Sequence, residues 1–127
     1  MTLASPLICI VDDDLSVRRA LGRLITSAGY AVATFGSARD FLTLAPSVRT
    51  ACLVLDIYLD EMDGFELQAR LAADRADIPI IFMTAHDDAT TRERIERAGV
   101  AGVLGKPFDG ERLLEAIRGV VDRGAGA

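Results

Sequence analysis

The sequence has few of the features that mark secreted, membrane-spanning or nucleic-acid-binding proteins. Its two cysteines, Cys9 and Cys52, lie far apart in apolar runs, so neither a disulfide scaffold nor a C-x-x-C motif is indicated. No apolar stretch approaches the roughly 20 residues that cross a bilayer, and the first residues do not read as a secretory signal. The formal net charge is -5 without a basic run, which argues against direct nucleic-acid binding. We expect a cytoplasmic protein.

The chain is long enough for one ordinary domain. Its 127 residues are 50% hydrophobic, which is enough for a sizeable core. No internal repeat or low-complexity segment divides it. We therefore expect a single domain over residues 1–127.

Short apolar runs alternate with longer segments of helical period. In those segments apolar residues recur three or four positions apart, as Val17, Leu21 and Leu24 do. The alternation is typical of a parallel sheet covered by helices on both faces, and it predicts an α/β domain of five βα units. The expected strands are residues 7–11, 30–35, 51–55, 78–83 and 101–105.

Residues suited to helix ends separate these segments. Gly29 and Gly99 each follow a helical segment, where a left-handed C-cap is favoured. Side chains that cap helix N-termini are expected at Asp14, Ser37, Asp63 and Asp109.

Polar residues gather at one edge of the predicted sheet. In open α/β sheets, ligands bind outside the carboxyl ends of the strands, near the point where strand order reverses. Four of the predicted strands are followed directly by polar residues, and these form a small set: Asp12, Asp13, Asp56, Thr84 and Lys106. A doubly wound sheet of order 2-1-3-4-5 would bring these side chains together.

The acidic members of this set have the chemistry of a hard-cation site. Neighbouring carboxylates repel by ~1 kcal/mol even at the dielectric of water, so an offsetting charge is expected beside Asp12 and Asp13. Mg2+ prefers one or two carboxylates together with waters and a phosphate oxygen. We expect Asp13 and Asp56 to bind Mg2+ directly and Asp12 to bind it through water. A backbone carbonyl near Tyr58 would add a neutral oxygen.

Asp56 also has the surroundings of a phosphoryl acceptor. An ionised aspartate forms an acyl phosphate when the incoming phosphoryl charge is neutralised. A bound cation would keep Asp56 ionised, Lys106 would balance phosphoryl charge, and the Thr84 hydroxyl would donate a hydrogen bond. Each residue alone is explained more simply, as a turn former, a surface ammonium or a capping hydroxyl. Their joint placement on successive strand ends favours the site.

Four segments together resemble the receiver domain of bacterial two-component response regulators. These are IVDDD, LVLDIYLDEMDGFEL, IIFMTAHDD and AGVAGVLGKPF, and the last carries the Lys-Pro-Phe of residues 106–108. The resemblance covers nearly the whole chain and includes Gly64, eight residues after Asp56. It implies a flavodoxin-like fold and a cis peptide bond between Lys106 and Pro107.

The resemblance also assigns roles to the polar set. It implies that Asp56 accepts a phosphoryl group from a phosphohistidine on a sensor kinase, while Asp12 and Asp13 serve Mg2+. Thr84 and Lys106 would contact the phosphoryl group. The chain would then be a phosphorylatable switch that controls an output domain or partner, rather than a conventional enzyme.

The segment GYAVATFGSARDFLTLAPS resembles the nitrogen-fixation regulator subgroup, whose members usually carry a C-terminal helix-turn-helix domain. The sequence shows no such domain within its 127 residues. Receivers of this type often pair through the fourth helix, fifth strand and fifth helix when phosphorylated, so the resemblance implies a possible homodimer. The alternative for the charged fourth helix is a solvated face with local ion pairs; its charged residues are Arg92, Glu93, Arg94, Glu96 and Arg97.

Three positions depart from the family pattern. Asp60 stands where a proline is common, so the loop after Asp56 is expected to be looser or differently braced. Val103 stands where the family commonly has the aromatic ring that moves during switching. Gly105 removes a side chain before Lys106 and frees the backbone there.

Two further residues lie close to the predicted site. Tyr58 and His86, the only histidine, each follow a predicted site residue by two positions. His86 is expected either to lie exposed in its loop or to guide water to the acyl phosphate, and Tyr58 and His86 could flank the phosphoryl group from opposite sides.

Two other functions fit parts of the sequence. Asp12, Asp14 and Ser16 form a D-x-D-x-S pattern, which resembles the haloacid dehalogenase phosphatases with Asp12 as nucleophile. That superfamily also needs an acidic pair on a strand after its lysine, whereas the residues after Lys106 read as a helix. The second alternative is a receiver fold that serves as a docking module without phosphorylation.

Overall fold

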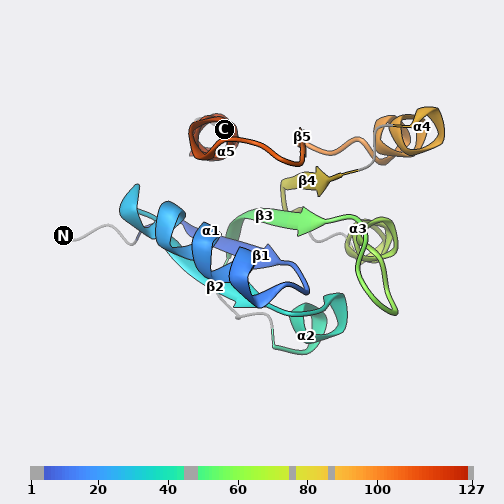
Figure 1. Cartoon of the computed structure of the whole chain (residues 1–127), viewed down its shortest axis with the longest axis horizontal. Coiled ribbons are helices and arrows are strands. Elements are labelled where there is room, and N and C mark those ends of the chain that lie inside the picture. The colour runs from blue at the N-terminus through green and yellow to red at the C-terminus, as the bar shows by residue number, and fades with distance from the viewer. Residues whose placement is uncertain (1–4, 45–48, 75–76, 86–87, 126–127) are drawn as a thin grey trace.

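The computed structural model describes residues 5–44, 49–74, 77–85 and 88–125. Within them, five parallel strands form one sheet in the order β2-β1-β3-β4-β5, and a helix follows each strand (Figure 1). The strands are β1 (Leu7–Val11), β2 (Ala31–Phe35), β3 (Thr50–Asp56), β4 (Ile80–Thr84) and β5 (Gly102–Gly105). The helices are α1 (Leu15–Ser27), α2 (Ala38–Leu44), α3 (Gly64–Ala73), α4 (Ala89–Ala98) and α5 (Gly110–Ala125). The predicted flavodoxin-like α/β fold and strand order are confirmed.

Helices cover both faces of this sheet and form two separate hydrophobic clusters. On one face α1 and α5 bury residues such as Leu21 and Leu113 against the strands. On the other face α2 and α3 bury Phe41 and Phe65, and α4 adds the partly buried Ile95. None of these helices, over the residues described, is long and apolar enough to cross a membrane.

The central strand β3 supplies both clusters in alternation. Cys52 and Val54 belong to the cluster beneath α1 and α5, whereas Leu53 and Leu55 belong to the cluster beneath α2 and α3. All four are fully buried. Successive side chains of a strand point to opposite faces, and both faces here are covered. This is why β3 reads as a continuous apolar run and not as an alternating one.

The first strand has the predicted bounds, and the boundaries of the other four strands differ from the predicted ones by at most two residues. The largest shift is in β4, which was expected to begin at residue 78 and begins at Ile80. Pro79 has no amide hydrogen to donate to a ladder, although its carbonyl accepts a hydrogen bond from Leu53 N at 2.9 Å. Apolarity marked Ile78 as strand, but the proline delays the start of the paired ladder.

The expected helix caps are present. Asp14 accepts hydrogen bonds from Ser16 N and Val17 N at the start of α1. The Ser16 side chain, followed by the backbone N–H groups of Val17 and Ser16, lowers the pKa of Asp14, which therefore needs no metal to offset its charge. The other caps are Ser37, Asp63 and Asp109 at N-termini, with positive φ at Gly29 and Gly99 after α1 and α4.

The two buried thiols should be chemically inert in the folded chain. Cys9 and Cys52 are fully buried and free. Burial raises the pKa of Cys52 to about 12 and also raises that of Cys9, so both stay protonated in mildly alkaline solution. The thiolate is the reactive form of cysteine. At about pH 8, an aromatic disulfide reagent should therefore label the native chain roughly 100-fold more slowly than the chain in denaturant. Fast release of one chromophore equivalent from the native chain would contradict this burial.

Candidate functional site

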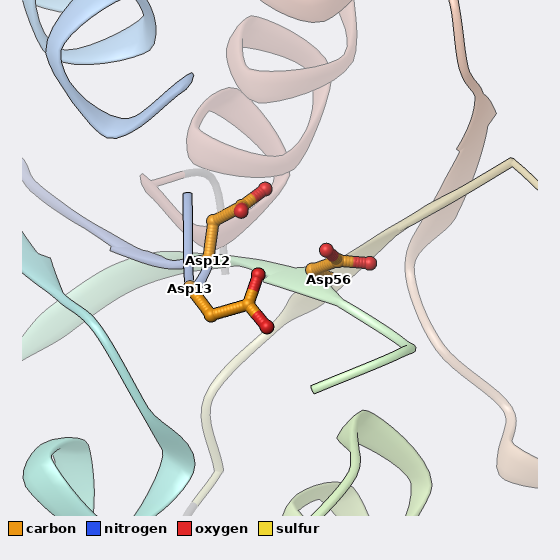
Figure 2. Close-up of side chains that lie close together, drawn as sticks. All are labelled: Asp12, Asp13 and Asp56. Atoms are coloured by element: carbon orange, nitrogen blue, oxygen red, sulfur yellow. The ribbon is translucent and has the colours of Figure 1, made fainter. Parts of the chain in front are cut away.

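Three carboxylates converge at the carboxyl edge of the sheet (Figure 2). Asp12 and Asp13 follow β1, and Asp56 is the last residue of the neighbouring strand β3. One oxygen from each lies within 4.8 Å of the others. Asp12 and Asp56 are buried, with 1% and 8% of their surfaces exposed, while Asp13 is exposed. The cluster therefore opens to solvent on the side of Asp13.

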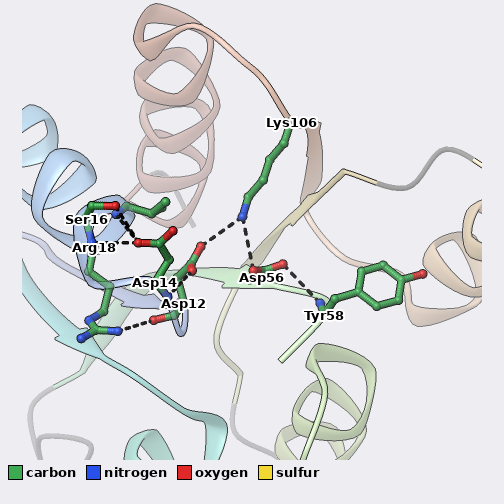
Figure 3. A network of polar contacts seen from close by, with 8 residues as sticks. Asp12, Asp14, Ser16, Arg18, Asp56, Tyr58 and Lys106 are labelled. Atoms are coloured by element: carbon green, nitrogen blue, oxygen red, sulfur yellow. Dashed lines mark hydrogen bonds and ion pairs between the residues drawn. The ribbon is translucent and has the colours of Figure 1, made fainter. Parts of the chain in front are cut away.

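Lys106 connects two of these carboxylates (Figure 3). Its Nζ donates to Asp12 Oδ2 at 3.1 Å and to Asp56 Oδ2 at 3.2 Å. The residue follows β5, and its backbone N–H donates to the carbonyl of Thr84 at 2.6 Å. The edge strand thus delivers an ammonium group to the carboxylates of β1 and β3.

Burial and charge act in opposite directions within this cluster. Burial raises the pKa of Asp56; Lys106 counteracts that effect and Asp12 adds to it, leaving a net increase. For Lys106, burial lowers the pKa, but the charges of Asp56 and Asp12 outweigh it and the net pKa is raised. Three carboxylates and one ammonium leave an excess of negative charge, which a further cation would neutralise.

The donor set fits a hard divalent cation. Carboxylate oxygens are the ligands that Mg2+ and Ca2+ prefer, and the group of Asp12, Asp13 and Asp56 contains no nitrogen or sulfur donor. Mg2+ commonly uses only one or two carboxylates and keeps several waters, which suits a cluster with one solvent-exposed member. The residues present therefore suit a magnesium-type site.

Thr84 lies at the same edge of the sheet. It is the last residue of β4, is 5% exposed, and pairs in register with Gly105. Since β4 lies between β3 and β5, Thr84 is placed between the strand that carries Asp56 and the strand that leads to Lys106. All five residues of the predicted polar set thus end at one edge.

Tyr58 links the Asp56 loop to α4. Its backbone N–H donates to Asp56 Oδ1 at 3.2 Å, and its hydroxyl lies 2.9 Å from Thr91 Oγ1. Thr91 is buried in the first turn of α4. Its backbone N–H and its hydroxyl both donate to the carboxylate of Asp88, the N-cap residue of this helix. The Tyr58 hydroxyl is thus engaged at α4, while His86, its expected counterpart, lies outside the described residues. Sequence reasoning missed this contact, which joins residues 33 positions apart.

The structure places the three residues that depart from the family pattern. The loop with Asp60 in place of proline closes through a hydrogen bond from Gly64 N to the carbonyl of Ile57 at 2.8 Å. Val103 is 47% exposed at the outer edge of the sheet, opposite Phe82 of β4, and Gly105 ends β5 opposite Thr84. One expected family feature is present, since the peptide bond between Lys106 and Pro107 is cis.

Comparison with known proteins decides the family. The model of the response regulator receiver domain matches residues 8–118. This chain belongs to the response regulator receiver domain family. Its members are phosphorylatable switches and not conventional enzymes, so the chain is a phosphoacceptor domain of a two-component system. The family implies a cognate histidine kinase.

Individual relatives agree with this assignment. Nodulation protein W of Bradyrhizobium diazoefficiens is 39% identical over 117 residues, which cover 92% of this chain and 52% of that protein. The structure of full-length FixJ from B. japonicum has a TM-score of 0.86 at 32% identity, over 95% of this chain and 60% of that one. The structure of the response regulator StyR has the same TM-score at 42% identity, over 97% and 62%. The receiver spans about half the length of the curated relatives it matches.

The burial of Asp12 also disfavours the phosphatase alternative. That interpretation needs Asp12 as a nucleophile that a substrate can reach. Asp12 is only 1% exposed, whereas Asp56 is 8% exposed and has the solvent-exposed Asp13 beside it. Together with the family match, this burial argues against Asp12 as a nucleophile.

Proposed function

We propose that Asp56 is the residue of this receiver that accepts a phosphoryl group from the phosphohistidine of a sensor histidine kinase, in a Mg2+-dependent reaction. The observation that carries this proposal is the convergence of Asp12, Asp13, Asp56 and Lys106 at one sheet edge. An Asp56 oxygen forms a bond to phosphorus while the phosphorus–nitrogen bond to histidine breaks, and that electron pair leaves with the imidazole.

Lys106 and Thr84 are proposed to stabilise the transferred group. The Lys106 ammonium already lies 3.2 Å from Asp56 Oδ2, so it stands within reach of a phosphoryl oxygen attached to that carboxylate. Thr84 ends the adjacent strand and would donate its hydroxyl to a second oxygen. Both interactions neutralise charge that accumulates on the phosphoryl oxygens.

Mg2+ is the proposed cation. Asp13 and Asp56 would supply direct ligands, Asp12 would act through water, and the backbone carbonyl of Tyr58 would complete the protein donors. When bound, the ion supplies positive charge for the phosphoryl oxygens. Asp13 is exposed to solvent, from which the ion would enter, and Asp56 is the proposed acceptor, which supports both as direct ligands. The oxygens of Asp12 already accept from Asp14 N and Lys106, which supports a contact through water.

Chemical phosphorylation tests the proposal. The receiver is incubated with acetyl phosphate or phosphoramidate, with Mg2+ or with a chelator, and its intact mass is measured. We expect the mass of one phosphoryl group, only when Mg2+ is present, and its loss on brief exposure to base or hydroxylamine. A label that forms equally in chelator or resists hydroxylamine would reject an Mg2+-dependent acyl phosphate.

Replacing Asp13 with asparagine should change metal-free and metal-bound stability in opposite directions. Without metal, the variant loses a charge that repels Asp12 and Asp56, so its free energy of unfolding should rise slightly. With Mg2+, it loses a ligand, and each tenfold loss of affinity removes about 1.4 kcal/mol of metal-dependent stabilisation at saturation. Thermal melts with and without Mg2+ measure both effects.

The exposed Asp60 provides the matched control, because Asp60→Asn removes the same charge from the neighbouring loop. It should leave the Mg2+-dependent shift of the melting temperature unchanged. An Asp13→Asn variant with the full Mg2+-dependent shift would remove Asp13 from the site.

For the output, we propose a homodimer through α4, β5 and α5 that forms on phosphorylation. The half-exposed Val103 of β5 and the exposed charged side chains of α4 support this surface. The beryllofluoride complex with Mg2+ should sediment as a dimer, and the untreated receiver as a monomer. A monomer in both states would favour a role without pairing.

A further inference from the structure

Arg18 reaches from α1 to the backbone of the acidic loop (Figure 3). Its Nη1 donates to the carbonyl oxygen of Asp12 at 2.7 Å, at the short end of the range for such bonds. The guanidinium therefore binds the peptide group that joins Asp12 to Asp13. It does not contact the carboxylate of Asp12, whose oxygens are taken by Asp14 N and Lys106.

With this contact, every polar group of Asp12 has a partner. The N–H of Asp12 donates to the carbonyl of Phe35 at 3.2 Å, at the end of β2. Its carboxylate accepts from the backbone of Asp14 and from Lys106, and its carbonyl accepts from Arg18. The residue is thus held by β2, by α1 and by the segment after β5. A residue held at all of these groups has little freedom to rotate, and it fixes the start of Asp13.

Gly36 leaves the space that the guanidinium occupies. A Cβ atom at position 36 would lie 3.2 Å from Arg18 Nη1 and 3.6 Å from its Cζ. Gly36 directly follows β2, so the end of this strand packs against the arginine without a side chain of its own. A side chain at position 36 would therefore press on the Arg18 guanidinium, and glycine avoids that contact.

We propose that Arg18 is a positioning residue for the cation site: it fixes the peptide between Asp12 and Asp13 and thereby aims the Asp13 carboxylate. The inference rests on the proposed function, because it takes Asp13 as a cation ligand. Groups that orient metal ligands commonly change affinity by 10- to 100-fold when removed. Since Arg18 acts on the backbone beside the ligand, we expect the lower end, about tenfold.

The sign of the effect separates positioning from simple electrostatics. Arg18 is a positive charge near a cation site, so its charge alone weakens cation binding, and removing it should strengthen binding. Positioning predicts the opposite result. A loss of affinity in Arg18→Met therefore cannot come from the lost charge, while the methionine retains most of the aliphatic packing of the arginine stem.

Mn2+ serves as the probe, and its binding is measured from the electron spin resonance signal of the free ion. The original receiver is compared with Arg18→Met, with Arg18→Lys and with Arg19→Met. Lysine keeps the charge and can place one donor at the Asp12 carbonyl. Arg19 is the exposed neighbour on α1, and Arg19→Met removes the same charge.

We expect about tenfold weaker Mn2+ binding in Arg18→Met, recovery of most of that loss in Arg18→Lys, and equal or slightly tighter binding in Arg19→Met. Phosphorylation of Arg18→Met by phosphoramidate should return to the original rate at saturating Mg2+, since the acceptor itself is intact. Unchanged or tighter Mn2+ binding in Arg18→Met overturns the inference.

Two controls keep the outcomes distinct. Absence of Mn2+ binding to the original receiver would reject the proposed function and with it the premise of this inference. If Arg18→Met does not unfold cooperatively, Arg18→Leu replaces it, because leucine also lacks the charge and the donor and favours the helix. Weaker Mn2+ binding by Arg18→Leu supports the role of Arg18, and unchanged binding overturns it.

Discussion

Asp56→Asn is expected to abolish phosphoryl incorporation from phosphoramidate. An asparagine amide has the same shape as the carboxylate but does not form an acyl phosphate, and the variant also lacks one cation ligand. The folded state should survive the change. Burial raises the pKa of Asp56, which means that the fold disfavours its charged form, and a neutral amide avoids that cost while Lys106 keeps its contact with Asp12. Intact mass after equal incubation measures the loss.

Asp60→Asn is again the matched control, because it changes an exposed carboxylate four residues further along the same loop. It should accept the phosphoryl group as fully as the original receiver. Equal labelling of Asp56→Asn would refute the assignment of the acceptor, and a label mapped to Asp12 would restore the phosphatase interpretation.

Gly64→Ala is expected to destabilise the fold and to disturb the acceptor together. A Cβ at this position would lie 2.7 Å from the carbonyl oxygen of Asp56 and 2.8 Å from Cα of Ile57. Both are backbone atoms, which cannot rotate away as a side chain can. Relief requires either α3 or the end of β3 to move, and overpacking of this kind costs about 1–3 kcal/mol or more. Urea unfolding measures the loss.

The same substitution at Gly22 should have the opposite sign. Gly22 lies inside α1, where an added Cβ would meet only Val32 and Thr34 side chains at ordinary distances of 3.9 and 4.0 Å. Alanine in a helix interior is favoured over glycine by up to about 1 kcal/mol. If Gly64→Ala proves as stable as Gly22→Ala, the close approach of α3 to β3 is not as described. A reduced labelling rate in folded Gly64→Ala would report displacement of Asp56.

The sequence predicts the sheet well because its signals are local. The three central strands β1, β3 and β4 are buried apolar runs, so their residues identify them without knowledge of their neighbours. The polar set could also be placed, since parallel strands bring their carboxyl ends to one edge. The starts of helices could be predicted for the same reason, since Asp14 and Asp63 cap helices that begin immediately after them.

The contacts that refine the site could not be predicted, because they depend on distances across the fold. The bond from Arg18 ends on a backbone carbonyl, which is present at every position and so leaves no mark in the residue pattern. The Tyr58–Thr91 contact joins a loop to a helix that the sequence places far away. On α4, Arg94 Cζ lies 4.1 Å from the ring centre of Phe65, whereas the charged pattern indicated either a solvated face or a dimerisation face.

The shape of β5 constrains how two receivers can meet. This strand forms one edge of the sheet, spans only four residues and has glycine at both ends. Two residues further on, Pro107 offers no amide hydrogen. A second chain that added a strand here would gain very few main-chain bonds, and short edges of this kind discourage edge-to-edge aggregation. Two copies that associate on this side would therefore be joined by side chains of α4, β5 and α5, and such a contact can form and dissociate without an intermolecular sheet.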